Sequence, residues 1–232
     1  MIIVSKYIIQ SYMKIKALVA VRSGSIRVPN KNICQFADSS LLEIKLKQLL
    51  RIKELDGIIV NSNDDDMIKL AIKYGCEVIK RSEYYSSNCV SMSDVYKNMA
   101  ENFNADVVAY MNVTNPLLED KTIIEAIKEY KNKSDIYDSL NSAHLIKEFL
   151  FKDNLAINYD LRHQPRSQDL PDICALNFAI NILSKEKMIE CKNVVGYNPN
   201  IFIIDEVEAT DIDNQIDFEF AEFVYKKKNN LY

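Results

Sequence analysis

Short apolar runs alternate with stretches of helical spacing through the first half of the chain. The runs have the length of buried strands and end in polar loops; they cover residues 16–21, 57–61, 77–80 and 106–111. Between them, apolar side chains recur every three or four residues, as on one face of a helix. This alternation predicts a mainly parallel sheet with helices on both sides, and a ligand cleft at the carboxyl ends of the strands.

Apolar residues at helical spacing also predict which faces of the helices are buried. The predicted inward residues are Leu42, Leu46, Leu49 and Leu50 in one helix, Ile123, Ile127 and Tyr130 in a second, and Ile216, Phe220, Phe223 and Val224 in the last. Another helix follows residues 62–66, which supply an N-cap and first-turn carboxylates, and it is expected to end at Gly75.

The rhythm changes between about residues 134 and 171, where short alternating stretches are rich in polar residues. We interpret this segment as a small β-rich insertion that caps the cleft or joins two subunits. Strand-like runs return at residues 175–183 and 201–204. The chain is therefore expected to be an α/β protein with an N-terminal extension at residues 1–13 and one domain at residues 14–232.

Composition and charge narrow the classes of function. The formal net charge of −4 over 232 residues argues against a broad nucleic-acid-binding face, although a local cationic cluster could still bind a small anion. The five cysteines are scattered without a CxxC pair, and neither histidine has ligand spacing with them, so we expect reduced thiols in a cytoplasmic protein and no zinc site. Lysines interrupt the apolar N-terminus, so neither a signal peptide nor a membrane span is predicted.

The loop at residues 22–32 is the first candidate for chemistry. It places Arg22, Arg27 and Lys31 around small residues, among them Gly24. Glycine permits close approach of the backbone, whose amides can bind phosphate oxygens, while the cations offset phosphate charge. A GxxxxGK[ST] phosphate loop is absent from the sequence. The alternative is an ordinary solvated basic loop.

An acidic segment near the C-terminus is the second candidate. Asp211 and Asp213 are two residues apart, so in extended backbone both side chains point to one side. Paired carboxylates suit Mg²⁺, which commonly also binds substrate phosphates. The alternative is an acidic turn that caps the following helix. Because no Ser-His-Asp or Cys-His set is evident, direct phosphoryl transfer through positioning and charge stabilisation is favoured.

Short segments along the chain form an ordered series of motifs. They are Arg-Ser-Gly-Ser-Ile-Arg-Val-Pro-Asn-Lys-Asn at 22–32, Asn-Ser-Asn-Asp at 61–64, Arg81 in Ile-Lys-Arg-Ser, Asn-Val-Thr-Asn-Pro at 112–116, Arg-Ser-Gln-Asp-Leu-Pro at 166–171, Asn-Phe-Ala-Ile-Asn-Ile at 177–182 and Asp-Ile-Asp-Asn-Gln-Ile-Asp-Phe at 211–218. In order and spacing, the series resembles the acylneuraminate cytidylyltransferases over about residues 15–225.

The resemblance implies a Rossmann-like, three-layer α/β/α domain that dimerises through the inserted lobe. It implies Mg²⁺ as cofactor and transfer of CMP from CTP to a nonulosonic acid of the sialic, legionaminic or pseudaminic type, by in-line attack on the α-phosphorus with release of pyrophosphate. The implied roles are CTP binding by Arg22, Ser23, Gly24, Ser25, Asn32 and Arg81, catalysis by Arg22, Arg27, Lys31 and Asp211, Mg²⁺ binding by Asp211 and Asp213, and binding of the acidic acceptor by Asn112, Lys147, Arg166 and Gln168.

The sequence departs from the family's pattern at several positions. Ile26 stands where a lysine is common, Asn112 is shorter than the usual glutamine, Asn115 replaces a serine, and Phe178 replaces a glycine that leaves room near the acceptor. The nucleotide half fits the pattern better than the acceptor half. We therefore expect use of CTP with an unusual acceptor.

Other functions remain open at this point. They include CMP transfer to a phosphonate or to the eight-carbon acid KDO, although the KDO enzymes tend to Gly-Lys-Pro where this chain has residues 30–32. A metal-dependent glycosyltransferase would use Asp-x-Asp, which usually lies mid-chain. A homologue that binds nucleotide without turnover would be consistent with Ile26 and Phe178.

Overall fold

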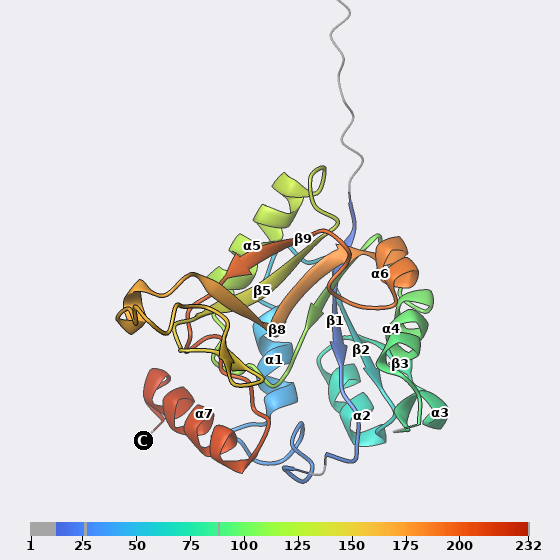
Figure 1. Cartoon of the computed structure of the whole chain (residues 1–232). Coiled ribbons are helices and arrows are strands. Elements are labelled where there is room, and N and C mark those ends of the chain that lie inside the picture. Colours follow the sequence, from blue (N-terminus) through green and yellow to red (C-terminus); the bar gives the residue numbers. More distant parts are fainter. Residues whose placement is uncertain (1–12, 26, 88, 232) are drawn as a thin grey trace, which may run out of the picture.

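The computed structural model describes residues 13–25, 27–87 and 89–231 (Figure 1). Its strands are β1 (Ile15–Ala20), β2 (Ile58–Ser62), β3 (Glu77–Lys80), β4 (Val107–Met111), β5 (Ser139–Ile146), β6 (Phe151–Lys152), β7 (Leu155–Ala156), β8 (Ile173–Ser184) and β9 (Pro199–Ile203). Its helices are α1 (Leu41–Leu49), α2 (Asp65–Lys73), α3 (Glu83–Ser86), α4 (Met92–Glu101), α5 (Asp120–Lys133), α6 (Lys185–Cys191) and α7 (Gln215–Lys228), with one 3-10 turn at Ser167–Asp169. The predicted N-terminal extension, apart from Met13, and the departure at Ile26 lie outside the described residues.

A seven-stranded sheet in the order β3-β2-β1-β4-β8-β5-β9 forms the centre of the domain. The pairs β1–β2, β1–β4, β2–β3 and β5–β9 are parallel, whereas β8 runs antiparallel to both β4 and β5. The predicted mainly parallel α/β sheet is confirmed, and each strand-like run of the sequence falls within it.

Alternate side chains of the central strands enter two separate cores. In β1, Ala17 and Val19 pack with α1, α2, α5 and α7, whereas Leu18 faces the opposite side with α4 and α6. In β4, Ala109 and Tyr110 divide in the same way. Because successive residues of a strand point to opposite faces, apolar runs buried on both sides produce a three-layer α/β/α arrangement.

The loops that follow β1, β2 and β4 meet at one edge of the sheet, as expected for parallel strands (Figure 1). At this edge, Val21 N donates to Asn61 O at 3.0 Å, and Arg81 N, just after β3, donates to Ser62 O at 2.8 Å. The predicted cationic loop, which begins at Arg22, and the backbone of Arg81 therefore lie at the same edge.

The segment predicted as an insertion at about residues 134–171 is smaller than expected. Its first part forms β5, which pairs with β8 and β9 inside the main sheet. The remainder holds the short antiparallel pair β6–β7 and the 3-10 turn. We call residues 147–172 the lobe.

Helix α1 differs in one residue from its predicted inward face. Leu42, Leu46 and Leu49 are buried, as expected, but Leu50 is 53% exposed. The helix ends at Leu49, and Leu50 is its C-cap. In α5, the three predicted residues are all buried.

Helix α7 buries a different face from the one predicted. Phe218 and Ala221 are buried, whereas Ile216, Phe220 and Phe223 are exposed and Val224 is half-buried. The cause is Phe36, whose ring lies edge-on to Phe218 at 5.1 Å and to Tyr225 at 5.6 Å between centroids. The contact with Phe36 selects the stripe at 218, 221 and 225 over the equally spaced stripe at 216, 220 and 223.

Within the described residues, the helices are all too short or too polar to cross a lipid bilayer.

The packing of α7 yields a test of which stripe is buried. Phe218→Ala removes a ring that is 8% exposed, and we expect it to lower the free energy of unfolding by about 3 kcal/mol because it leaves a cavity beside Phe36. Phe220→Ala, on a side chain that is 51% exposed, should change it by less than about 1 kcal/mol. Urea unfolding of both variants measures the difference, and equal losses would contradict the assignment.

Candidate active site

The cationic loop after β1 is anchored at both ends. Asn32 is buried. Its side-chain amide donates to Arg22 O at 3.3 Å, and its main-chain carbonyl accepts from Leu42 N at 2.9 Å. Ser23 is held by Asn63, whose Oδ1 accepts from Ser23 N at 3.3 Å and whose Nδ2 donates to Ser23 Oγ at 3.1 Å. The start of α1 and the end of β2 therefore fix the path of the loop.

Gly24 has a positive φ of 84°, a conformation that favours glycine. A Cβ at this position would meet no protein atom within 4 Å, so the space above the backbone is open. The glycine is needed for the backbone turn, and the open space leaves the loop accessible to a ligand.

A first cavity of about 360 Å³ lies on one side of Arg22. Its walls include Arg81, Tyr85 and Tyr110. Arg81 is buried and donates from Nε to Asn61 Oδ1 at 2.6 Å, so its guanidinium is held at a fixed angle. Burial lowers the pKa of Arg81, and the neighbouring Arg22 also lowers it. A planar, partly anionic ligand would fit between the tyrosine rings and these two arginines.

A second cavity, also of about 360 Å³, lies on the other side of Arg22. Its lining consists of Arg22, Gly24, Ser25, Arg27, Val28, Lys31 and Asp213. Burial lowers the pKa of Lys31, while Asp211 and Asp213 oppose that shift. Three cations around one open cavity suit the charge of a phosphate chain.

The cationic loop contacts the acidic segment near the C-terminus directly. Arg27 NH2 lies 2.8 Å from Asp213 Oδ1, and Lys31 Nζ donates to the carbonyl of Ile212. Asp211 is exposed at the surface, but its pKa is raised, mainly by partial desolvation of the carboxylate. Repulsion from Asp213 also raises this pKa, and a hydrogen bond from Thr114 lowers it. The two predicted metal ligands therefore lie together, beside the cations.

The loop after β4 is hydrogen-bonded to the acidic segment. Ile212 N donates to Thr114 O at 2.9 Å. The side-chain amide of the fully buried Asn115 donates to Ala209 O at 3.3 Å and to Thr210 O at 3.1 Å. Main-chain positions on both sides of Asp211 are thus tied to residues 114 and 115.

A third cavity of about 370 Å³ opens on the far side of Asp211. It is lined by His144, Leu176, Asn177, Phe178, Glu206, Ala209, Thr210 and Asp211. Behind its wall, two buried polar atoms, His144 Nδ1 and Asn177 Nδ2, have no hydrogen-bond partner among the described residues. Phe178 has a positive φ of 55°, which is uncommon outside glycine.

Shared or nearby lining residues connect the three cavities. Arg22 lines both the first and the second cavity, Asp213 lines the second, and Asp211 lines the third. A ligand spanning the first two cavities would present a phosphate beside Asp213. A second ligand in the third cavity would meet it at residues 211–213.

The predicted acceptor residues are not among those that line the three cavities. Asn112 directly follows β4 and is half-buried. Lys147 donates to Leu170 O at 2.7 Å and pairs with Asp172, Arg166 pairs with Asp169 at 2.7 Å, and Gln168 is exposed on the 3-10 turn. The residues described as lining the three cavities include none of these four.

Sequence reasoning did not identify His144, Asn177 or Thr114 as site residues. His144 and Asn177 line one cavity beside a bulge, where the pairing of β5 with β8 shifts at Ser142 and residues 177–180 of β8 face that single residue. Asn177 begins the motif at 177–182, which was a usable signal, whereas His144 lies in no such motif. Thr114 lies within a motif that the sequence did single out, so its place after β4 was a usable signal.

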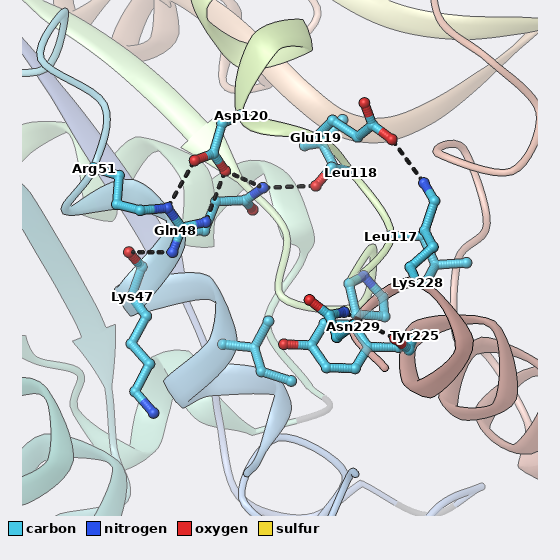
Figure 2. Close-up of a pocket in the computed structure, with 12 residues that line it drawn as sticks. Lys47, Gln48, Arg51, Leu117, Leu118, Glu119, Asp120, Tyr225, Lys228 and Asn229 are labelled. Carbon is cyan, nitrogen blue, oxygen red and sulfur yellow. Dashed lines mark hydrogen bonds and ion pairs between the residues drawn. The ribbon is translucent and has the colours of Figure 1, made fainter. Parts of the chain in front are cut away.

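A further cavity, of about 430 Å³, lies between α1, the loop before α5 and the end of α7 (Figure 2). Figure 2 shows two ion pairs in it: Arg51 Nε lies 2.7 Å from Asp120 and Lys228 lies 2.7 Å from Glu119. Gln48 donates to Leu118 O at 2.6 Å. Its lining shares no residue with the three cavities above, so we do not assign a substrate to it.

Comparison with known proteins agrees with this geometry. The model of the family described as cytidylyltransferase matches residues 16–230. The chain is 26% identical over 227 residues to post-translational flagellin modification protein B of Campylobacter coli, covering 93% of this chain and 97% of that protein. It is 26% identical over 225 residues to pseudaminic acid cytidylyltransferase of Campylobacter jejuni, covering 92% and 97%.

More distant similarities agree with these. The chain is 25% identical to N-acylneuraminate cytidylyltransferase of Escherichia coli, covering 93% of this chain and 53% of that protein. The solved structure of a CMP:2-keto-3-deoxy-manno-octonic acid synthetase complexed with CTP superposes with a TM-score of 0.67 at 10% identity, covering 93% of this chain and 99% of that one. At that identity, the superposition supports the fold alone.

The second cavity predicts an anion site that depends on Arg27. Arg27→Gln should weaken binding of inorganic tripolyphosphate about tenfold, because a charge-assisted hydrogen bond contributes on the order of 1.5 kcal/mol. Isothermal titration calorimetry measures the affinity. Arg162→Gln is the matched control, since Arg162 is also an exposed arginine paired with a carboxylate, Asp160, but lies on the lobe. Unchanged affinity in Arg27→Gln would contradict the assignment.

Proposed function

The chain belongs to the cytidylyltransferase family, and we propose that it transfers CMP from CTP to a nonulosonic acid with release of pyrophosphate. One observation carries the proposal: Asp213 lines the cationic cavity, and Asp211 lines the neighbouring cavity. A phosphate chain and an acceptor bound in these two cavities would approach each other at the two carboxylates.

CTP would occupy the first and second cavities. The base and ribose would lie near Arg81, Tyr85 and Tyr110, and the phosphates would lie near Arg27 and Lys31. Arg22 lines both cavities and would contact the nucleotide where its α-phosphate lies. Gly24 would let the phosphates approach the backbone, and Asn32 and Ser23 would keep the loop in place.

Asp211 and Asp213 fit a magnesium ion. Their oxygens are hard donors of the kind that Mg²⁺ prefers, and they lie beside the cavity proposed for phosphates. Repulsion between the two carboxylates contributes to the raised pKa of Asp211, and a cation would remove it. When bound, Mg²⁺ would offset charge on the phosphates.

In the reaction, a hydroxyl oxygen of the acceptor attacks the α-phosphorus of CTP, and the bond to the β-phosphate oxygen breaks. The residues of the chain act mainly by position and charge. Arg22, Arg27 and Lys31 neutralise the phosphates and the departing pyrophosphate. The wall at residues 209–211 keeps the acceptor next to the α-phosphate.

The acceptor class is inferred from the relatives together with the third cavity. Pseudaminic acid and N-acylneuraminic acid are named as acceptors of similar enzymes. Phe178 narrows the cavity where a glycine is usual in the resembling family, which favours an acceptor other than N-acetylneuraminate. Asn112 lies at the adjoining end of β4 and would contact the acceptor from there.

We further propose a homodimer formed through the lobe, in the cytoplasm. The lobe and the adjoining end of β5 expose the apolar side chains of Leu145, Phe151, Leu155, Ile157 and Leu161. A group of exposed apolar residues on one small segment is typical of an interaction surface. Lys147, Arg166 and Gln168 lie on the same segment and would serve the acceptor from there. All five cysteines are free thiols, which supports a reducing compartment.

The proposed reaction predicts pyrophosphate release with CTP, Mg²⁺ and a nonulosonic acid. The acceptors to compare are pseudaminate, legionaminate and N-acetylneuraminate, with KDO and aminoethylphosphonate as the alternative classes. Asp211→Asn should lower kcat at least about 100-fold, as expected for loss of charge that is needed in the transition state. A coupled assay for pyrophosphate measures both.

Asp135→Asn, an exposed carboxylate beyond the end of α5, is the matched control and should retain wild-type activity. Equal rates with UTP and CTP, or no release with any of the three nonulosonic acids, would contradict the proposal. Release with KDO or the phosphonate alone would move the enzyme to that acceptor class.

The proposed dimer predicts a change in mass on one substitution in the lobe. Leu155→Asp puts a charge on an exposed apolar side chain of β7 and should convert a dimer into a monomer, because an unpaired charge in an apolar interface is unfavourable. Ile72→Asp, on an equally exposed residue of α2, should leave the mass unchanged. Sedimentation velocity measures the mass; a wild-type monomer would contradict the proposal.

A further inference from the structure

Lys45 is a fully buried lysine on α1 that the mechanism above does not use. Its Nζ donates to Gln48 Oε1 at 2.8 Å and to the main-chain carbonyl of Asn115 at 3.2 Å. Among the described residues, no carboxylate lies within ion-pair distance of Nζ. An unpaired buried charge is unfavourable, so the position calls for an explanation beyond packing.

The surroundings of Lys45 suit a hydrogen-bond donor better than a charge. Burial lowers its pKa to about 7, with Asp120 at the start of α5 acting in the opposite direction. The carboxylate of Asp120 is itself bound by Arg51, at 2.7 Å. A neutral amine has two N–H groups, which match the two acceptors that Nζ contacts.

The contact with Asn115 connects Lys45 to the acidic segment. Lys45 holds the carbonyl of Asn115, and the side-chain amide of Asn115 holds the carbonyls of Ala209 and Thr210. The next residue in the chain is Asp211. On its other side, Ile212 N donates to Thr114 O. The backbone at Asp211 is therefore held by the loop at residues 114–115, and Lys45 of α1 fixes that loop.

We infer that Lys45 and Asn115 are positioning residues that fix Asp211 and Asp213 for metal binding. The inference rests on the proposed function, in which these carboxylates hold Mg²⁺. Lys45 itself touches neither substrate. Lys45 fixes the position of the loop at residues 114–115. Asn115 in turn fixes the position of residues 209–212 through its side-chain hydrogen bonds. Each of these hydrogen bonds is weak by itself. Each nevertheless supplies a partner to a buried group that water cannot reach.

Replacing Lys45 distinguishes a positioning role from a purely structural one, because only a positioning role confines the effect to the segment around Asp211. Methionine is unbranched and fills buried space much as the stem of lysine does. Lys45→Met should therefore stay folded, although its stability falls because Asn115 O and Gln48 Oε1 lose their donor. The loop can then move, and the effect should be concentrated at Asp211 and its neighbours, not spread over the domain.

Amide hydrogen exchange tests the placement without any substrate. In Lys45→Met, the amide of Ile212 should exchange at least about tenfold faster, since its bond to Thr114 O depends on the loop. The amide of Val21, which donates to Asn61 O at the same edge of the sheet, should stay within about twofold of wild type. Asn115→Ser should give the same selective change.

Kinetics supply the second readout. In both variants we expect the concentration of Mg²⁺ that gives half-maximal activity to rise about tenfold, with the KM for CTP within about twofold of wild type. The double variant should be no worse than the more severe single variant, because both act through one chain of contacts. Lys53→Met, an exposed lysine just after α1, is the matched control and should behave as wild type.

The outcomes separate this inference from the proposed reaction. Uniform acceleration of exchange at Ile212 and Val21, or none at either, would overturn the positioning role even if the enzyme turns over. A rise in KM for CTP equal to the rise in the Mg²⁺ requirement would overturn it as well. Selective exchange at Ile212 in an enzyme without cytidylyltransferase activity would support the positioning of the segment and overturn the proposed function.

Discussion

The packing that places the loop after β1 beside the segment before α7 is the constraint on which the site depends. It brings Arg27 to Asp213 and Lys31 to Ile212, residues from opposite ends of the chain. The Arg27–Asp213 pair is exposed, and such pairs contribute only about 0–1 kcal/mol to stability. The pair therefore does not hold the two segments together. They are placed by apolar packing of Phe36 on α7 and by the loop after β4, and the charges remain available to a ligand.

This division explains which parts of the fold could be predicted from the sequence. The buried strands and helix α5 could be predicted from local periodicity. Their apolar residues are buried regardless of which other element packs against them. Helix α7 carries two apolar stripes with the same spacing, and periodicity cannot choose between Phe218 and Phe220. The choice is made by Phe36, which lies far away in sequence. Leu50 was misplaced for a local reason, since the helix ended one residue before it.

The candidate site divides in a similar way. Arg22, Arg27, Lys31, Asp211 and Asp213 could be proposed from the sequence because their chemistry suits phosphates and a metal ion, and the structure brings them together. His144 could not, because it lies in none of the motifs and its place at the third cavity follows from the pairing of β5 with β8. Lys45 could not either: in the sequence it is one more lysine on a helix, and only its complete burial distinguishes it. Whether Lys147 and Arg166 serve the acceptor stays a prediction.

The cavities proposed for the two substrates differ in how their walls are held. Those proposed for CTP are lined by loops that the buried side chains of Asn32, Asn61 and Arg81 join by hydrogen bonds. The acceptor cavity is formed around a bulge, where Ser142 donates to Asn177 Oδ1 at 2.6 Å and Phe178 adopts a left-handed backbone conformation. A side chain other than glycine in that conformation is held at a cost of about 1–2 kcal/mol. Retaining the ring despite this cost is consistent with Phe178 shaping the cavity. Under the proposed function, the hydrogen-bonded loops would hold the nucleotide, and the bulge would shape the cavity for the acceptor.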